Sequence, residues 1–197
     1  MDKGHEAFGR QMVWLNPPES SRFDVGKLCV TTREKTDFWR ETFYGFWRDN
    51  GHFLFERAGS DFTLEAAVTA KYEELYDQAG LMVRLSERHW IKTGVEYTDK
   101  KLHFSTVVTN NASDWSIIEI PSDIDTVRVR LVRYRDSIRT YFQVDVNSKW
   151  LLARVAYFPR SETIDVGLMC CSPERGSFTA YFENYSLQTK VHEGLHD

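Results

Sequence analysis

Hydrophobic and polar residues alternate with a period of two along most of this chain, from about residue 62 onward. Runs rich in Val, Ile, Thr, Tyr, Phe and Trp, separated by short polar turns, are typical of half-buried β-strands. The short gaps between the runs indicate hairpins and an antiparallel sheet. The pattern predicts strands at 62–71, 79–86, 89–97, 101–109, 114–120, 126–134, 137–145, 150–157, 164–171 and 178–187.

So many strands exceed what one open twisted sheet usually carries, so we expect either two packed sheets or a closed barrel, and favour the sandwich. The first sixty residues alternate less clearly, apart from a strand predicted at 27–32. We therefore expect a single all-β domain over residues 1–197, with a less regular N-terminal segment at 1–26 and a C-terminal tail at 188–197.

Composition narrows the classes of partner. The 197 residues are 42% hydrophobic and 14% aromatic, which is enough for a substantial core. The net charge is −4, and no long block of like charges appears, so nucleic acid is not an expected partner. No segment approaches the ~20 apolar residues of a membrane helix or resembles a signal-peptide core, so we expect no membrane contact and an intracellular protein.

Cysteine usage agrees with an intracellular location. Cys29, Cys170 and Cys171 form an odd set with an adjacent pair, which suits neither a disulfide framework nor a zinc site. We expect all three to be reduced and to fill space in the core. No spacing of histidines and cysteines elsewhere predicts a metal site, and no phosphate-binding glycine loop predicts a cofactor.

The segment HWIKTGVEY at 89–97 carries candidate binding chemistry, because alternation puts Trp90, Lys92, Gly94 and Glu96 on one face. An aromatic plate, a cation, a bare glycine and a carboxylate suit a concave surface that stacks on a flat ligand and hydrogen-bonds its edges. The alternative is an exposed face with a Lys–Glu pair, but Lys92 and Glu96 lie roughly 13 Å apart along a strand. The other face is predicted to be core: His89, Ile91, Thr93, Val95 and Tyr97.

The neighbouring segment would extend the same surface. Asp77 and Gln78 stand just before a predicted strand, and hairpin pairing would bring Arg84 or Met82 beside the face that holds Trp90. We therefore include Asp77, Gln78 and Arg84 among the candidate ligand-binding residues.

Two further segments admit two interpretations each. Asp114 and Trp115 enter another strand and represent either an Asx-type turn with a core tryptophan or a second part of the binding surface. The six aromatic residues between Phe38 and Trp47 are interpreted first as a structural cluster that closes one end of the sandwich, and second as the lining of a site.

Catalysis finds little support. A sandwich glycosidase needs two carboxylates about 5–9.5 Å apart, and only Glu96 with Asp114 or Asp77 could form such a pair, although nothing in the local sequence enforces it. The tail segment HEGLH at 192–196 matches the H-E-x-x-H zinc-protease pattern. Gly194 weakens a helix there and no third ligand follows, so we predict neither catalytic residues nor a bound metal.

Several segments resemble a known family when they are taken together: TDFWRETFYGFWRDNGHFL, YDQAGLMVRL, HWIKTGVEY, VVTNNASDWS and VGLMCCSPER. The chain is similar, from about Leu28 to Tyr185, to the fungal and bacterial family named for regulation of enolase protein, a domain-of-unknown-function family. The resemblance implies a concanavalin A-like lectin/glucanase jelly roll, a cytoplasmic location and a regulatory link to enolase and glycolysis. It supplies no catalytic mechanism.

These observations lead to an expected function. We expect a non-enzymatic regulatory or binding protein whose partner is enolase or another glycolytic protein. The alternative is a carbohydrate-binding module that uses the concave sheet face, and a glucanase-type hydrolase is the third possibility. Fold likeness alone does not decide between them.

Overall fold

The structure is a computed structural model that describes residues 5–59, 61–191 and 194–195. Every regular element in this part of the chain is a β-strand, so it offers no helix that could cross a membrane. The strands are β1 (His5–Ala7), β2 (Arg10–Leu15), β3 (Ser20–Asp24), β4 (Lys27–Thr31), β5 (Phe38–Arg40), β6 (Trp47–Asp49), β7 (His52–Ala58), β8 (Phe62–Ala70), β9 (Gln78–Ser86), β10 (His89–Thr98), β11 (Lys101–Asn110), β12 (Ala112–Glu119), β13 (Thr126–Tyr134), β14 (Ser137–Gln143), β15 (Leu151–Tyr157), β16 (Ile164–Cys171) and β17 (Thr179–Gln188).

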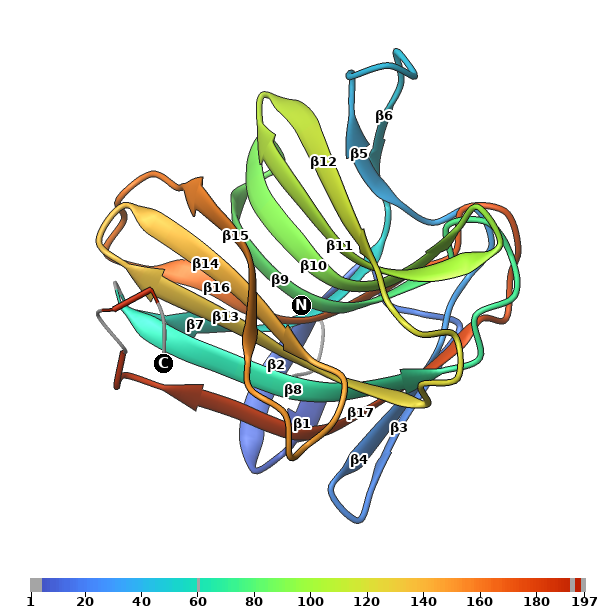
Figure 1. Ribbon diagram of the computed structural model, residues 1–197, viewed down its shortest axis with the longest axis horizontal. Helices are drawn as coiled ribbons and strands as arrows, with labels where there is room; N and C mark the ends of the chain where they lie inside the picture. Colours follow the sequence, from blue (N-terminus) through green and yellow to red (C-terminus); the bar gives the residue numbers. More distant parts are fainter. Residues whose placement is uncertain (1–4, 60, 192–193, 196–197) are drawn as a thin grey trace.

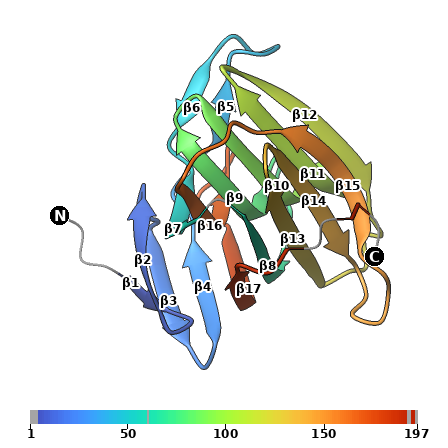
Figure 2. The same cartoon turned by 90° about the vertical axis from the view of Figure 1, so that its left-hand side faces the viewer.

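Two antiparallel sheets pack face to face (Figures 1 and 2). The front sheet has eight strands in the order β1-β2-β7-β16-β9-β10-β11-β12, and the back sheet has seven in the order β15-β14-β13-β8-β17-β4-β3. A separate two-stranded sheet is the β5–β6 hairpin, which stands out from the sandwich beside β12 in Figure 1. The predicted all-β, two-sheet antiparallel sandwich is confirmed.

Alternation located the strands well in the second two-thirds of the chain. The bounds of β8 to β17 agree with the predicted strands within two residues, and β4 was also predicted. The strands β1, β2 and β3 were not predicted from the sequence, because β1 and β3 are short edge strands and β2 buries little of its length. The expectation of a less regular segment at 1–26 is therefore wrong for its described residues.

The two faces of β10 have different neighbours. Ile91 and Val95 lie in the main core between the sheets, while Trp90 belongs to a second apolar cluster on the outer face of the front sheet. Lys92 and Glu96 share the face of Trp90, as the alternation predicted. The front sheet is thus buried on both sides at this point.

The β5–β6 hairpin covers that outer face. Its Phe38 and Trp39 are buried in the second cluster, against Met82 and Trp90. The backbone amide of Arg40 donates to Ser113 Oγ over 2.9 Å, which ties the hairpin to the start of β12. The hairpin therefore forms a wall over the front sheet.

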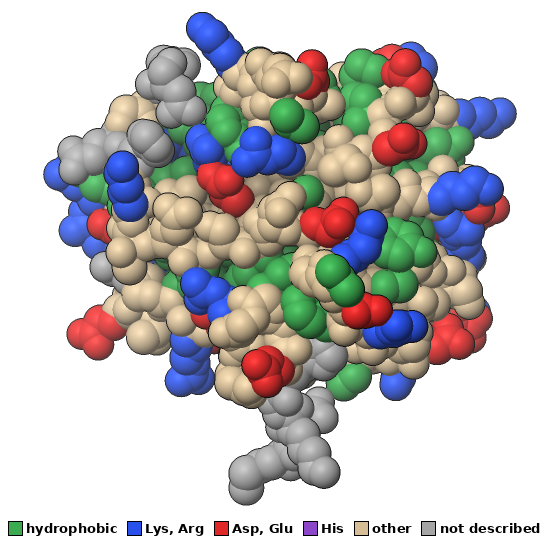
Figure 3. Space-filling model, turned by 90° about the horizontal axis from the view of Figure 1, so that it is seen from below, with side chains coloured by type: hydrophobic (Ala, Val, Ile, Leu, Met, Phe, Trp, Pro, Cys, Tyr) green, Lys and Arg blue, Asp and Glu red, His purple; other side chains and the backbone are tan. Residues whose placement is uncertain are grey.

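Charged side chains of opposite sign are mixed on the molecular surface. In the view of Figure 3, Lys and Arg side chains lie beside Asp and Glu side chains, and neither sign covers a continuous area. Exposed pairs such as Arg22 with Asp24, 2.8 Å apart, illustrate this mixing. This face lacks the single-sign surface of a nucleic-acid binder.

Two glycines allow β9 and β10 to approach closely beneath the hairpin. Gly80 and Gly94 are paired across the two strands. A Cβ added at Gly94 would lie 2.2 Å from the carbonyl oxygen of Ala79, and one at Gly80 would lie 2.0 Å from that of Thr93. Both obstacles are backbone atoms, so the strands can accept a side chain only by moving apart.

We expect Gly94→Ala to lower the free energy of unfolding by about 1–3 kcal/mol, because it overpacks this strand pair. Urea denaturation measures the change. Gly59→Ala is the matched control, since an added Cβ there meets nothing within 4 Å. Equal stabilities of the two variants would contradict the close approach of β9 and β10.

Candidate functional site

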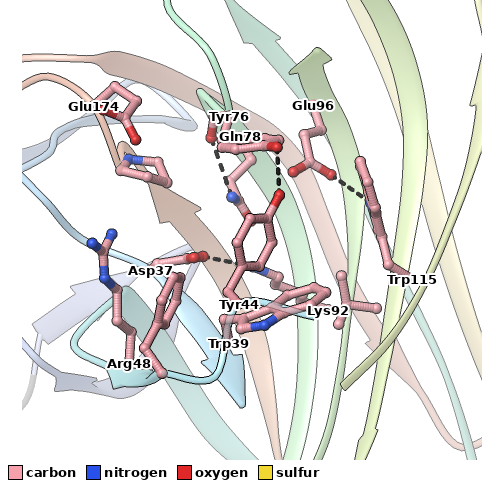
Figure 4. A pocket seen from close by; sticks show the side chains of 13 residues that line it. Asp37, Trp39, Tyr44, Arg48, Tyr76, Gln78, Lys92, Glu96, Trp115 and Glu174 are labelled. Atoms are coloured by element: carbon pink, nitrogen blue, oxygen red, sulfur yellow. Dashed lines mark hydrogen bonds and ion pairs between the residues drawn. The ribbon is translucent and has the colours of Figure 1, made fainter. Parts of the chain in front are cut away.

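A pocket lies between the outer face of the front sheet and the β5–β6 hairpin (Figure 4). Its volume of about 210 Å³ is below the ~300–1,000 Å³ of drug-sized ligand sites, so it suits a ligand of about one ring. Aromatic and charged side chains make up most of its lining. The lining residues are Asp37, Trp39, Tyr44, Phe46, Arg48, Tyr76, Gln78, Lys92, Glu96, Val107, Trp115, Pro173 and Glu174.

The floor of the pocket is formed by alternate residues of β10. Lys92 and Glu96 flank Gly94, whose neighbours across the sheet are Gly80 and Ser105. Neither glycine lines the pocket, and the separate space beside Gly94 holds only about 10 Å³. A ligand in the pocket therefore meets the side chains of Lys92 and Glu96 rather than the backbone between them.

Lys92 is held by a buried ion pair with Asp37. Lys92 Nζ donates to Asp37 Oδ1 over 2.9 Å, and the two side chains are 4% and 12% exposed. The amide of Phe38 donates to the same carboxylate oxygen over 2.8 Å. Burial is the largest single influence and lowers the pKa of Lys92, but the nearby acidic groups, Asp37 first among them, together outweigh it and leave the pKa raised. Lys92 thus stays charged and fixed.

Glu96 lies in a different environment. Trp115 Nε1 donates to Glu96 Oε2 over 3.1 Å, and it also lies 3.0 Å from Ser105 Oγ. Burial raises the pKa of the Glu96 carboxyl above its usual value, and the nearby charge of Lys92 offsets this only in part. Figure 4 shows the carboxyl group of Glu96 pointing into the pocket.

Aromatic side chains of the hairpin form the opposite wall. Tyr44 stacks on Phe46 with ring centroids 5.4 Å apart and meets Trp39 edge-on at 5.6 Å. The Tyr44 hydroxyl is 2.7 Å from that of Tyr76, which links the hairpin to the segment before β9 (Figure 4). Trp115 stands on the other side of the pocket, edge-on to Tyr76. The pocket therefore has flat apolar walls above a polar floor.

Of the eight candidate ligand-binding residues, four line the pocket: Gln78, Lys92, Glu96 and Trp115. Trp90 and Arg84 share their sheet face and are paired across the strands, as predicted. Both lie outside the lining, because the hairpin covers them: Trp90 packs 6.0 Å from the ring of Phe38, and Arg84 holds Asp49 through two hydrogen bonds of 2.7 and 2.8 Å.

Asp77 and Asp114 also lie outside the pocket lining. Asp77 is fully buried and accepts hydrogen bonds from Arg175 at 2.6 Å and Ser172 at 2.9 Å, so it anchors a loop. Asp114 is exposed and pairs with Arg154 of β15 over 2.7 Å. It lies inside β12 rather than in an Asx turn, and its neighbour Trp115 points to the opposite face, toward the pocket.

Sequence reasoning missed the contribution of the hairpin. The aromatic segment was interpreted first as a structural cluster, yet Trp39, Tyr44 and Phe46 line the pocket, and Asp37 and Arg48 flank them. The density of aromatic residues next to charged ones was the available signal. Asp37 and Lys92 are 55 positions apart, so their pairing could not be read from local spacing.

The arrangement suits binding better than bond cleavage. Three carboxyl groups line the pocket, those of Asp37, Glu96 and Glu174, and Asp37 Oδ1 already accepts hydrogen bonds from Lys92 and from the amide of Phe38. The described part of the chain holds no group of three His, Cys, Asp or Glu side chains arranged for a metal. Three residues of the HEGLH segment, His192, Glu193 and His196, lie outside the described residues.

Comparisons with known proteins agree with the sequence resemblance. The model of a family described as "Protein of unknown function (DUF1349)" matches residues 14–190. A Saccharomyces cerevisiae protein named "Regulation of enolase protein 1" is 44% identical over 187 residues, which cover 95% of this chain and 94% of that one. A crystal structure of a functionally unknown S. cerevisiae protein has 43% identity and a TM-score of 0.87, covering 93% of this chain and 97% of that chain.

More distant solved structures share the fold. A xylan β-1,4-xylosidase from Bacillus halodurans superposes with a TM-score of 0.65 at 13% identity, over 82% of this chain but 32% of the enzyme. The carbohydrate-binding module CBM66 from Bacillus subtilis superposes with a TM-score of 0.50 at 19% identity, over 81% of this chain and 94% of the module. At these identities the likeness establishes the lectin-like β-sandwich and nothing of the chemistry.

We expect Asp37→Asn to lower the free energy of unfolding by about 3–5 kcal/mol, because it leaves Lys92 buried without a counter-charge. The double variant Asp37→Asn/Lys92→Met removes both charges and should recover part of the loss. Chemical denaturation measures all three proteins. Glu119→Gln, which removes an exposed ion pair with Lys101, is the control and should unfold like the wild type. A double variant no more stable than Asp37→Asn would contradict the proposed coupling.

Proposed function

This chain belongs to the DUF1349 family, and we propose that it is a non-enzymatic regulatory protein that binds a carbohydrate in the pocket beneath the β5–β6 hairpin. The observation that carries the proposal is the combination of flat aromatic walls with a buried polar floor. The proposal includes the cytoplasmic location that the sequence resemblance implies.

The chemistry of a sugar ring matches this combination. A pyranose has faces of C–H groups that pack against aromatic rings, and its edges carry hydroxyls that donate and accept hydrogen bonds. Trp115 and Trp39 offer such rings, while Lys92, Glu96 and Gln78 offer polar groups at the floor. Small-molecule sites are usually built in this way, as an apolar pocket in which a small number of polar groups converge on the ligand.

The state of the two carboxyl groups at the pocket floor, Asp37 and Glu96, favours a binding role over hydrolysis. Glycoside hydrolysis needs one acid and one free carboxylate that acts as base or nucleophile. Asp37 is the candidate for the second role, and its pairing with Lys92 occupies it. The likeness to a xylosidase extends over only a third of that enzyme and concerns the fold.

Regulation of enolase is the second function that we propose, and the name of the S. cerevisiae relative supports it. The match covers 95% of this chain and 94% of the relative at 44% identity, so the two proteins correspond over nearly their whole lengths. In this view the pocket senses a carbohydrate while another part of the surface meets a glycolytic protein.

We expect the wild-type protein to bind at least one neutral monosaccharide or disaccharide from a panel, as measured by isothermal titration calorimetry. Trp115→Ala should weaken this binding by about tenfold or more, because aromatic anchors dominate such sites. Trp150→Ala is the control, since Trp150 packs against Arg128 and Arg130 on the back sheet. If both variants bind like the wild type, the sugar does not occupy this pocket.

We expect purified enolase from the same organism to bind the immobilised chain and to change its catalytic rate when the chain is added. Biolayer interferometry and a coupled enolase assay provide the two readouts. Heat-unfolded chain serves as the control. If enolase neither binds the chain nor changes its rate at a saturating concentration of the chain, direct regulation of enolase is ruled out. The carbohydrate proposal would then still stand.

A further inference from the structure

We infer that the pocket selects an uncharged sugar and discriminates against sugar acids and sugar phosphates, with Glu96 acting as a neutral carboxylic acid that donates a hydrogen bond to a ligand hydroxyl. This inference rests on the proposed carbohydrate-binding function and names the chemical class of its ligand. It follows from how the charges that line the pocket are already compensated.

Five side chains that carry a carboxyl, ammonium or guanidinium group line the pocket: Asp37, Arg48, Lys92, Glu96 and Glu174. Asp37 and Lys92 cancel each other through their 2.9 Å contact at the floor. Arg48 and Glu174 add one charge of each sign to the lining. Glu96 is the remaining group, so the pocket is electrically neutral when Glu96 carries a proton.

The surroundings of Glu96 favour that proton. The side chain is almost fully buried, and the indole N–H of Trp115 and the hydroxyl of Ser105 donate hydrogen bonds to it. Lys92, the nearest cation along the strand, forms its ion pair with Asp37. Burial raises the pKa of the Glu96 carboxyl, in agreement with this geometry. A buried carboxyl group without a cation of its own avoids the cost of an ionised form by keeping its proton.

Other titratable groups face Glu96 without forming an ion pair with it. His103 lies directly across from Glu96 on β11, and no hydrogen bond joins the two side chains in the described structure. Tyr76 lies on the β9 side of the pocket, where its hydroxyl is engaged by Tyr44.

An anionic ligand would meet an unfavourable floor. A phosphate or carboxylate seated between Lys92 and Glu96 would lie close to the charge of Asp37, and Lys92 is already neutralised. A second anion at this buried floor, where no further cation lies, carries a large desolvation penalty in a low-dielectric site. A neutral hydroxyl can instead accept from the Glu96 acid and the Lys92 ammonium without any new charge. Phosphorylated sugars are therefore excluded from this pocket.

The test compares ligands that share one sugar ring and differ only in charge. We would titrate wild-type protein with methyl glucoside, glucuronic acid and glucose 6-phosphate, and with the matching galacto and manno series. All titrations would be made at one pH, about 7.5. In whichever of the gluco, galacto or manno series binds, the neutral sugar should bind at least about tenfold more tightly than the sugar acid and the sugar phosphate.

Two results would overturn the inference. Equal or tighter binding of a charged sugar, lost in Arg48→Gln, would show that the pocket prefers anions, while the proposed carbohydrate function would stand. Absence of binding by every sugar in the panel would overturn the proposed function together with this inference. Both results come from wild-type protein or a rim variant, so they do not depend on how substitutions at the floor affect folding.

Variants of Glu96 test its role as a donor. Glu96→Ala should weaken neutral-sugar binding by about tenfold, and the conservative Glu96→Gln should restore most of it, because an amide also donates and accepts. Glu119→Gln, an exposed carboxylate on β12, is the control. Loss of binding in Glu96→Gln equal to that in Glu96→Ala would show that an ionised carboxylate is required.

Infrared difference spectroscopy detects directly whether the Glu96 carboxyl carries a proton. The spectrum of wild-type protein minus that of Glu96→Gln should contain the carbonyl band of a protonated carboxylic acid. The carboxylate band in its place would overturn the assignment of Glu96 as a neutral acid. This measurement needs no ligand and is independent of the binding panel.

Discussion

The buried contact between Lys92 and Asp37 is the interaction on which the pocket depends. It joins the floor of the front sheet to the β5–β6 hairpin, two parts of the chain that no backbone pairing connects at that point. A buried ion pair adds little net stability, but breaking it leaves a charge in an apolar environment. Its role is to fix where the hairpin lies, and thereby to decide that a pocket exists there.

The remaining features of the site follow from that position. The hairpin brings Trp39 and Tyr44 over the sheet, where they line the pocket together with Lys92 and Glu96. Because Lys92 is committed to Asp37, Glu96 has no cation of its own. One ion pair therefore shapes the pocket and also sets the charge that the ligand meets.

The lectin-like sandwich by itself is compatible with several functions. Its relatives by fold include an enzyme and a binding module, and the relative named for regulation of enolase shares nearly the whole chain. What distinguishes this chain is the chemistry of one face of β10 and its cover. A functional assignment has to start from those side chains rather than from the fold.

Period-two alternation determined the all-β sandwich, the bounds of most strands and the two faces of β10, because a strand that is core on one side must alternate. It also put Lys92 and Glu96 on one face, while Gln78 and Trp115 joined the candidate set from the polar and aromatic residues of neighbouring segments. Only the tertiary structure separated these from Asp77 and Asp114 and added the hairpin. Contacts such as Asp37 with Lys92 join residues far apart in the chain, and their pairing depends on how the hairpin packs and not on any local pattern.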